Sequence, residues 1–232
     1  MPIFGLYFTP MELFLLIIGG IITLWAQIKV KSTFAQYNKI RSRSGITGAQ
    51  VAQDILRSNN VYDVEIEETR GTLTDHYDPK AKVLRLSSDI YRSSSVAALG
   101  VAAHEAGHAL QHHVGYAPLN VRNGIFPVAS LGSQLAFPLF IAGFFFRSGT
   151  MMDIGIWLFL GAVIFQLITL PVEFNASSRA LVQLESGGYL QRDEIGSARK
   201  VLSAAALTYV AATAVAIMHL VRLLILRGAG DD

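Results

Sequence analysis

The sequence predicts an α+β membrane protein, in which a bundle of about four transmembrane helices is joined to one small polar domain. The chain has 232 residues, of which 52% are hydrophobic and only 16% are charged, and its mean hydropathy is +0.42. These values are too apolar for an ordinary soluble domain of this length. The apolar residues also gather in separate runs, and a single polar block follows the first run.

The charge balance and the lack of cysteine exclude several classes of function. A total of 19 Lys and Arg against 17 Asp and Glu gives a net charge of +2, so we expect no binding of nucleic acid. With no cysteine, the chain has neither disulfides nor thiolate metal ligands. Any transition metal bound by this chain must therefore use histidine and carboxylate ligands.

The first apolar run, from about Leu13 to Ile28, predicts a transmembrane helix within an N-terminal segment 1–31. No Lys or Arg precedes the run and no small-residue cleavage site follows it, so a removable signal peptide is not expected. Five basic residues crowd its C-terminal side: Lys29, Lys31, Lys39, Arg41 and Arg43. By the positive-inside rule, the N-terminus faces outward and the polar domain is cytoplasmic. A buried core helix, the alternative, does not explain this flanking charge.

The polar block predicts a domain over residues 32–125 in the order helix, small sheet, helix. Thr47 can cap an amphipathic helix that ends near Arg57. Strand-forming residues then alternate with polar ones in three stretches, at Val61–Thr69, Leu73–Tyr77 and Val83–Ser87. A turn at Asp78-Pro79-Lys80 joins the last two stretches. The second helix is expected over Val96–His113, with serine N-caps before it and Gly115 after it.

Three further apolar runs complete the predicted bundle. Residues 126–172 predict a transmembrane helical hairpin, made of the spans Phe126–Phe146 and Ile154–Val172, with Pro127 and Pro138 as kink points. A polar segment 173–200 follows the hairpin. The C-terminal helix, residues 201–232, is rich in alanine, and we expect it to be embedded in the membrane. Its small residues also permit self-association into a homo-oligomer.

The sequence His104-Glu105-Ala106-Gly107-His108 predicts a catalytic zinc site. In a helix, His104 and His108 lie one turn apart on the same face, so both imidazoles can reach a single ion. Glu105 projects beside the metal, where it can take a proton from bound water and later pass it to the leaving amine. We therefore expect one Zn²⁺ per chain, with Glu105 as the general base.

The third metal ligand must come from another part of the chain. His112 continues the spacing, but three ligands on consecutive turns of a straight helix cannot converge on one ion. Glu173 is the better candidate, because it opens a polar run directly after an apolar span, and two histidines with a carboxylate are a common catalytic zinc set. Two predicted spans separate His108 from Glu173, which places both on the same side of the membrane. Glu185 and Glu194 are rival ligands deeper in the polar segment.

Other polar residues have two interpretations each. The cluster of Asp75, His76 and Asp78 either forms the turn before Pro79 or places His76 beside the zinc as a substrate-binding residue or fourth ligand. Arg179 and Tyr116 could stabilise the oxyanion of the reaction, and each could equally be structural.

Five strings together resemble the YugP-type neutral zinc metallopeptidases of bacterial membranes over nearly the whole chain: Gly71–Pro79, Val83–Ser87, Val101–His108, Tyr116–Leu119 and Glu173–Ala180. The resemblance implies a membrane-bound, gluzincin-like peptidase with a zincin-like catalytic domain. It also implies that His104, His108 and Glu173 bind the zinc, and that the protein lies in the bacterial cytoplasmic membrane.

One position departs from the gluzincin pattern. Gluzincins often have an aspartate four residues after the ligand glutamate, and this chain has Ser177 there. The outer support that this aspartate gives a metal ligand must therefore come from another residue, for which Asn175 is a candidate.

These features together predict an endopeptidase that cleaves membrane or membrane-proximal proteins. An edge strand before the metal helix could pair with the backbone of an extended substrate, and the bilayer would limit which proteins reach it. The first alternative is a membrane adaptor with a structural zinc, for which His76 as a fourth ligand would be evidence. The second alternative is hydrolysis of a non-peptide amide or ester in a narrow apolar pocket.

Overall fold

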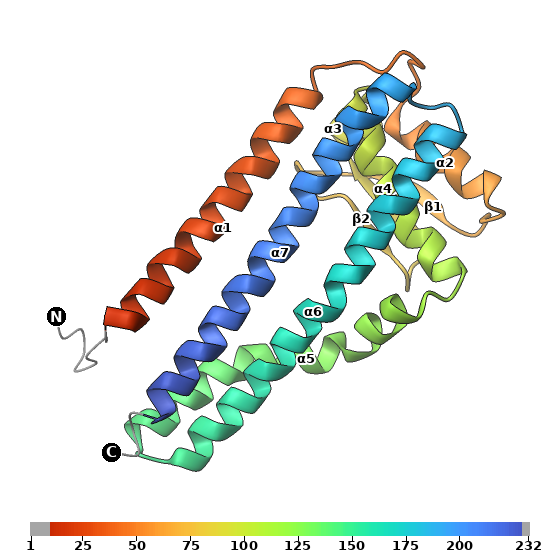
Figure 1. Cartoon of the computed structure of the whole chain (residues 1–232). Coiled ribbons are helices and arrows are strands. Elements are labelled where there is room, and N and C mark those ends of the chain that lie inside the picture. The colour runs from red at the N-terminus through yellow and green to blue at the C-terminus, as the bar shows by residue number, and fades with distance from the viewer. Residues whose placement is uncertain (1–9, 229–232) are drawn as a thin grey trace. The chain divides into compact units, whose positions relative to one another are not determined.

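The computed structural model describes residues 10–228, so the ends of the predicted segments 1–31 and 201–232 lie outside the described residues (Figure 1). Within this range the chain forms seven helices and three strands: α1 (Pro10–Tyr37), α2 (Gly48–Ser58), β1 (Glu65–Thr69), β2 (His76–Asp78), β3 (Val83–Ser87), α3 (Ser88–Tyr91), α4 (Val96–His113), α5 (Ala117–Phe145), α6 (Gly149–Ser186) and α7 (Arg192–Gly228). This composition confirms the predicted α+β membrane class.

The chain divides into two compact units. The helical unit comprises the described residues up to Gln27, residues 121–170 and the described residues from Thr208 onward. The mixed unit comprises residues 28–120 and 171–207 and contains the whole sheet. Each of the long helices α1, α5, α6 and α7 contributes residues to both units.

The helical unit has the surface of a protein that is solvated by lipid. Among the described helices, α1, α5, α6 and α7 are long and apolar enough to cross a membrane. Large apolar side chains lie exposed along them, including Trp25, Val128 and Trp157. Such a surface is stable in the hydrocarbon of a bilayer and would be unstable in water.

The helices continue past the ends of the predicted apolar spans. The helix α6 extends beyond Val172 to Ser186, and α7 begins at Arg192, so most of the polar segment 173–200 is helical. Hydropathy marks the apolar part of a helix and does not mark its ends, which explains the difference. The prolines at 127 and 138 lie inside α5.

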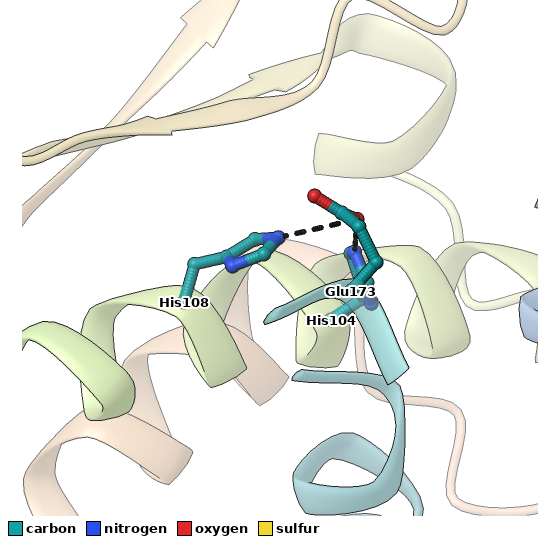
Figure 2. Close-up of side chains that lie close together, drawn as sticks. All are labelled: His104, His108 and Glu173. Carbon is teal, nitrogen blue, oxygen red and sulfur yellow. Dashed lines mark ion pairs between the residues drawn. The ribbon is translucent and has the colours of Figure 1, made fainter. Parts of the chain in front are cut away.

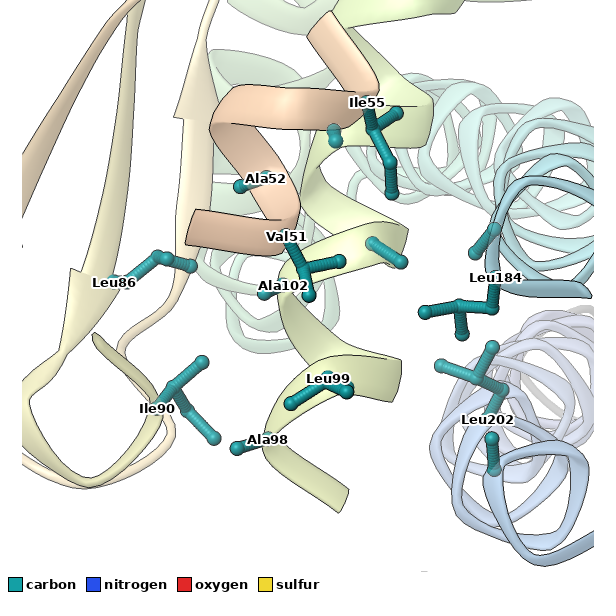
Figure 3. Packing of buried hydrophobic residues seen from close by; sticks show 14 of the residues in the cluster. Val51, Ala52, Ile55, Leu86, Ile90, Ala98, Leu99, Ala102, Leu184 and Leu202 are labelled. Carbon is teal, nitrogen blue, oxygen red and sulfur yellow. The ribbon is translucent and has the colours of Figure 1, made fainter. Parts of the chain in front are cut away.

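The mixed unit packs around α4, whose small residues allow other elements to approach closely. Alanines at 97, 98, 102, 103 and 106 are all buried in this helix. Leu86 of β3, Ile90 of α3, Leu184 of α6 and Leu202 of α7 belong to the same apolar cluster (Figure 3). Each such leucine contributes roughly 1.5–3 kcal/mol when its side chain is fully buried. The core of this unit therefore fixes the position of α4, the helix that carries His104 and His108.

The sheet of the mixed unit has the strand order β1-β3-β2. The central strand β3 pairs in parallel with β1, where Leu84 lies opposite Ile66, and antiparallel with β2, where Leu84 lies opposite Tyr77. The strand β2 is shorter than predicted, because Leu73 adopts a positive φ of 57° and belongs to the preceding turn. The turn after β2 forms as predicted, since Asp78 Oδ1 accepts hydrogen bonds from the backbone N–H groups of Lys80 and Ala81.

Candidate metal centre

The helix α4 carries the two predicted histidine ligands. Ser95 caps its N-terminus by accepting a hydrogen bond from the backbone N–H of Ala98 at 3.1 Å, and Gly115 follows its end with a φ of 63°. His104 and His108 lie one turn apart, and their ring centroids are 4.7 Å from each other in an edge-to-face arrangement. The sequence between the caps therefore places both imidazoles on one face, as predicted.

A close approach of two helices brings Glu173 to these histidines. Gly107, between the two, packs directly on α6, where a Cβ atom at this position would lie only 2.7 Å from the carbonyl oxygen of Ala176. Ala176 follows Glu173 by about one helical turn and is fully buried. A larger residue than glycine at position 107 would force α4 and α6 apart, so this glycine sets the distance between the histidines and the carboxylate.

His104, His108 and Glu173 converge to form one cluster (Figure 2). Their potential ligand atoms all lie within 4.8 Å of one another. Glu173 Oε2 is 3.4 Å from His104 Nε2 and 3.7 Å from His108 Nε2. Ligands about 2.0–2.2 Å from a tetrahedral zinc ion are separated by roughly 3.3–3.6 Å, and the two carboxylate–imidazole distances are close to this separation.

The unsatisfied state of Glu173 Oε2 also fits a metal. This oxygen is buried and makes no hydrogen bond of normal geometry with the described residues. The two imidazoles face this oxygen only at 3.4 and 3.7 Å, longer than a normal hydrogen bond, and a bound cation would compensate better for its burial. The donor set of two imidazoles and one carboxylate, without thiolates, suits zinc.

The cluster is mostly, but not completely, closed to solvent. The side chains of His104 and His108 keep 13% and 12% of their surface exposed, whereas Glu173 keeps 3%. Burial lowers the pKa of His108, but the carboxylates of Glu173 and Glu105 outweigh it and hold this pKa above its ordinary value. The two carboxylates therefore favour a positive charge at this position, which either a proton or a bound metal ion can supply.

Both histidines have uncharged partners on their second ring nitrogen. Ser177 Oγ lies 3.1 Å from His104 Nδ1, and Gln111 Oε1 lies 3.0 Å from His108 Nδ1. Asn175 was the predicted hydrogen-bond partner of a metal ligand. For His104 the partner is instead Ser177, at the position where gluzincins often have aspartate. Asn175 lies one step further out, where it contacts Gln111 and Arg179.

The spacing of residues in the sequence indicates both partners. Ser177 follows Glu173 by four residues and Gln111 follows His108 by three, and residues with these spacings share a helix face. A polar residue at such a spacing from a proposed ligand is a candidate for the ligand's hydrogen-bond partner.

The structure places His76 away from this cluster. Its Nδ1 lies 2.8 Å from the backbone oxygen of Thr74, and its Nε2 lies 3.5 Å from Arg85 Nη1, at an exposed site on the sheet. Alternate residues of a strand face opposite sides, and the neighbouring Tyr77 faces α4. Asp75 accepts hydrogen bonds from the backbone N–H and the hydroxyl of Ser87, and its burial raises its pKa. The arrangement therefore supports a structural role for Asp75.

Tyr77 connects the edge strand to the metal helix. Its hydroxyl lies 2.8 Å from His112 Nδ1, one turn beyond His108 on α4. Burial, followed by the charges of Asp63 and Asp78, raises the pKa of Tyr77 to about 12. This contact, which the sequence did not indicate, holds β2 against α4.

The remaining candidates lie at distinct places. Glu105 is buried, with 9% of its surface exposed, between the two histidines of α4. Glu194 accepts hydrogen bonds from the backbone N–H groups of Arg43 and Gln191, which gives it a structural role at the start of α7. Glu185 is exposed near the end of α6. Neither rival ligand belongs to the His-His-Glu cluster.

Two histidines one turn apart on one helix and a glutamate from a second helix form the donor set of a zinc peptidase. The model of a family described as "Putative neutral zinc metallopeptidase" matches residues 12–228, and the chain belongs to this family. The chain is also 50% identical over 220 residues to the "Putative membrane protease YugP" of Bacillus subtilis (strain 168), which covers 95% of this chain and 98% of that protein. No solved structure matches the chain significantly.

Proposed function

We propose that the chain is a zinc-dependent endopeptidase that hydrolyses peptide bonds of membrane or membrane-proximal proteins. The observation that supports this most strongly is the convergence of His104, His108 and Glu173, with Glu105 buried next to His104 in α4. Membership of the zinc metallopeptidase family and the similarity to a protein named as a membrane protease support it independently.

The roles of the residues follow from their chemistry. His104, His108 and Glu173 would hold one zinc ion, which would polarise the scissile carbonyl and lower the pKa of its bound water. Glu105 has no place in the ligand cluster, so its carboxylate is free to accept a proton from the attacking water and to deliver it to the leaving amine.

The edge strand β2 offers a place for an extended substrate. Among the described strands it pairs with β3 alone, and Tyr77 holds it next to α4. A substrate strand added to the free side of β2 would run beside the metal helix, and its backbone would make hydrogen bonds that depend little on its sequence. The four apolar helices keep the enzyme in the bilayer, which restricts its substrates to proteins that lie in or near the membrane.

The basic residues that follow the apolar part of α1 support an active site on the cytoplasmic side of the bacterial cytoplasmic membrane. The adaptor alternative requires a structural zinc site, which is normally closed by four protein ligands. The cluster among the described residues has three members, and His76 is bonded elsewhere. Three protein ligands leave a fourth position for water or substrate, so the arrangement favours catalysis.

The test is cleavage of an unfolded protein by the purified, zinc-loaded chain in detergent. We expect Glu105→Gln to bind zinc and to lower the rate of cleavage by about 10²–10⁴-fold, since it removes the general base and keeps the ligands. Glu185→Gln is the matched control, because it makes the same change at an exposed position of α6 and should cleave at the native rate.

Retained cleavage by zinc-loaded Glu105→Gln would overturn the role of Glu105. If the native chain binds zinc firmly and cleaves neither soluble nor membrane-inserted test proteins, the adaptor replaces the peptidase as the better explanation. If it instead hydrolyses only small amides or esters, the protein is a hydrolase of non-peptide substrates.

A further inference from the structure

We infer that Gln111 is a positioning residue of the metal centre, which locks His108 in the tautomer whose Nε2 is free to bind the metal. The inference rests on the proposed zinc site and extends it to residues outside the ligand set. It follows from a network of hydrogen bonds that links His108, Gln111, Asn175, Arg179 and Val172. Two of its ends have fixed roles, because the backbone carbonyl of Val172 can only accept and the guanidinium of Arg179 can only donate.

The first fixed end is a backbone carbonyl. Gln111 is completely buried, and its Nε2 lies 2.9 Å from the carbonyl oxygen of Val172. A carbonyl oxygen can only accept, so the amide NH₂ group must point toward Val172. Turning the amide over would place Gln111 Oε1 against this oxygen and leave two buried acceptors facing each other, which is unfavourable.

The second fixed end is a guanidinium. Arg179 Nε donates to Asn175 Oδ1 at 2.8 Å, and a guanidinium can only donate. The oxygen of Asn175 therefore faces Arg179, and the same oxygen lies 3.0 Å from Gln111 Nε2. Gln111 Nε2 thus has two acceptors, Val172 O and Asn175 Oδ1, for its two hydrogens. The carbonyl of Val172 and the guanidinium of Arg179 thus require the same orientation of the Gln111 amide.

The fixed amide determines which ring nitrogen of the neutral His108 carries the hydrogen. With its NH₂ group directed at Val172 and Asn175, Gln111 presents Oε1 to His108 Nδ1 at 3.0 Å. A hydrogen bond forms there only if Nδ1 carries the hydrogen. In the neutral ring, Nε2 then holds the lone pair, and Nε2 is the atom that lies 3.7 Å from Glu173 Oε2 in the cluster. Gln111 therefore both orients the ring and directs its lone pair into the metal site.

The two metal histidines differ in this respect. The partner of His104 Nδ1 is the Ser177 hydroxyl, which can donate or accept and can rotate. Ser177 is therefore compatible with either tautomer of His104. Gln111 can form its hydrogen bond with only one tautomer of His108. We expect the loss of Gln111 to weaken the metal site more than the loss of Ser177.

The test compares zinc affinity of the full chain in detergent by competition with a chelator. Gln111→Met keeps the length of the side chain and removes the acceptor, and we expect it to weaken zinc binding by about 10–100-fold. Gln183→Met is the matched control, because Gln183 pairs with Asn59 in the same unit and does not contact the ligands. It should bind zinc like the native chain.

A second measurement needs no stable variant. The ¹⁵N shifts of the histidine rings in the metal-stripped native chain, at a pH where His108 is neutral, report which nitrogen carries the hydrogen. We expect His108, identified by the loss of its signal in His108→Asn, to carry it on Nδ1. If Gln111→Met folds, its His108 should show a mixture of both tautomers. A merely structural role of Gln111 would leave the tautomer unchanged.

Two outcomes would overturn the inference: a native His108 with its hydrogen on Nε2, or native zinc affinity in folded Gln111→Met. Neither result depends on cleavage. If His108 behaves as expected and the native chain still cleaves nothing, the positioning role stands and the peptidase proposal fails. If the native chain cleaves and His108 has the other tautomer, the peptidase proposal stands and this inference fails.

Discussion

Two polar clusters of the mixed unit contain histidine and carboxylate, and they differ in their burial and in the partners of their carboxylates. The metal cluster consists of His104, His108 and Glu173, and none of these side chains is more than 13% exposed. The sheet cluster consists of Glu67, His76, Asp78 and Arg85. Its three charged side chains are 30–48% exposed and form ion pairs at the surface of the sheet.

The difference shows which kind of polar cluster indicates a function. In the sheet cluster, water and the guanidinium of Arg85 satisfy the carboxylates, so the fold meets little cost. In the metal cluster, Glu173 Oε2 is buried, makes no normal hydrogen bond and faces two imidazoles at 3.4 and 3.7 Å. Such long contacts compensate only in part for the burial of a charge, whereas a bound cation would compensate for it more fully. The combination of convergence, burial and an unsatisfied atom is therefore stronger evidence for a site than the residue types.

The largest expected effect is that of Glu173→Gln. The amide removes the charged ligand from a buried site, so we expect zinc affinity to fall by more than the roughly 10–100-fold that the loss of an outer partner costs. Cleavage should fall with zinc occupancy. Glu67→Gln makes the same change in the sheet cluster, where the side chain is 48% exposed, and should leave zinc binding unchanged. Competition with a chelator measures both variants.

The opposite result would change the assignment of the third ligand. If Glu173→Gln binds zinc as tightly as the native chain, a residue other than Glu173 completes the site, and the rivals Glu185 and Glu194 must be tested in the same way. If Glu67→Gln also loses zinc, the two clusters are coupled, and the contrast drawn between them is wrong.

Removal of the metal should have the next largest effect, this time on stability. Zinc at 100 to 1,000 times its dissociation constant stabilises the folded chain by about 2.7–4.1 kcal/mol, if the unfolded chain does not bind it. A chelator should therefore lower the unfolding temperature of the native chain in detergent. Glu173→Gln should unfold at nearly the same temperature with and without chelator. A native chain that is insensitive to the chelator would contradict the zinc site.

The sequence predicted the parts of this site that depend on local spacing. The helix over Val96–His113 and its two histidines follow from capping residues and from the period of the helix, and they appear at the predicted residues. Glu173 was a candidate because it opens a polar run directly after an apolar span, and the order of the membrane spans placed it on the same side as His108. This argument used the topology of the chain and did not need the packing of the helices.

The missing parts depend on packing between distant segments. The spacing of Gln111 from His108 makes it a candidate partner, but the orientation of its amide follows only from its contacts with Val172 and Asn175 of α6, and these contacts depend on the approach of α6 to Gly107. For His76, the sequence did not show which face of a short strand turns toward α4. The contact of Tyr77 with His112 decides this and turns His76 the other way.

The smallest expected effect is that of Arg85→Gln, which removes the ion pairs of the sheet cluster. These pairs lie near solvent, so we expect the free energy of unfolding to fall by less than about 1 kcal/mol, and the difference to shrink in high salt. Zinc affinity and the rate of cleavage should remain at native values, because Arg85 contacts no member of the metal cluster among the described residues. If Arg85→Gln instead slows cleavage without a change in stability or zinc binding, the sheet cluster contacts the substrate. His76, which lies beside Arg85, would then regain its predicted role in substrate binding, although it lies outside the metal cluster.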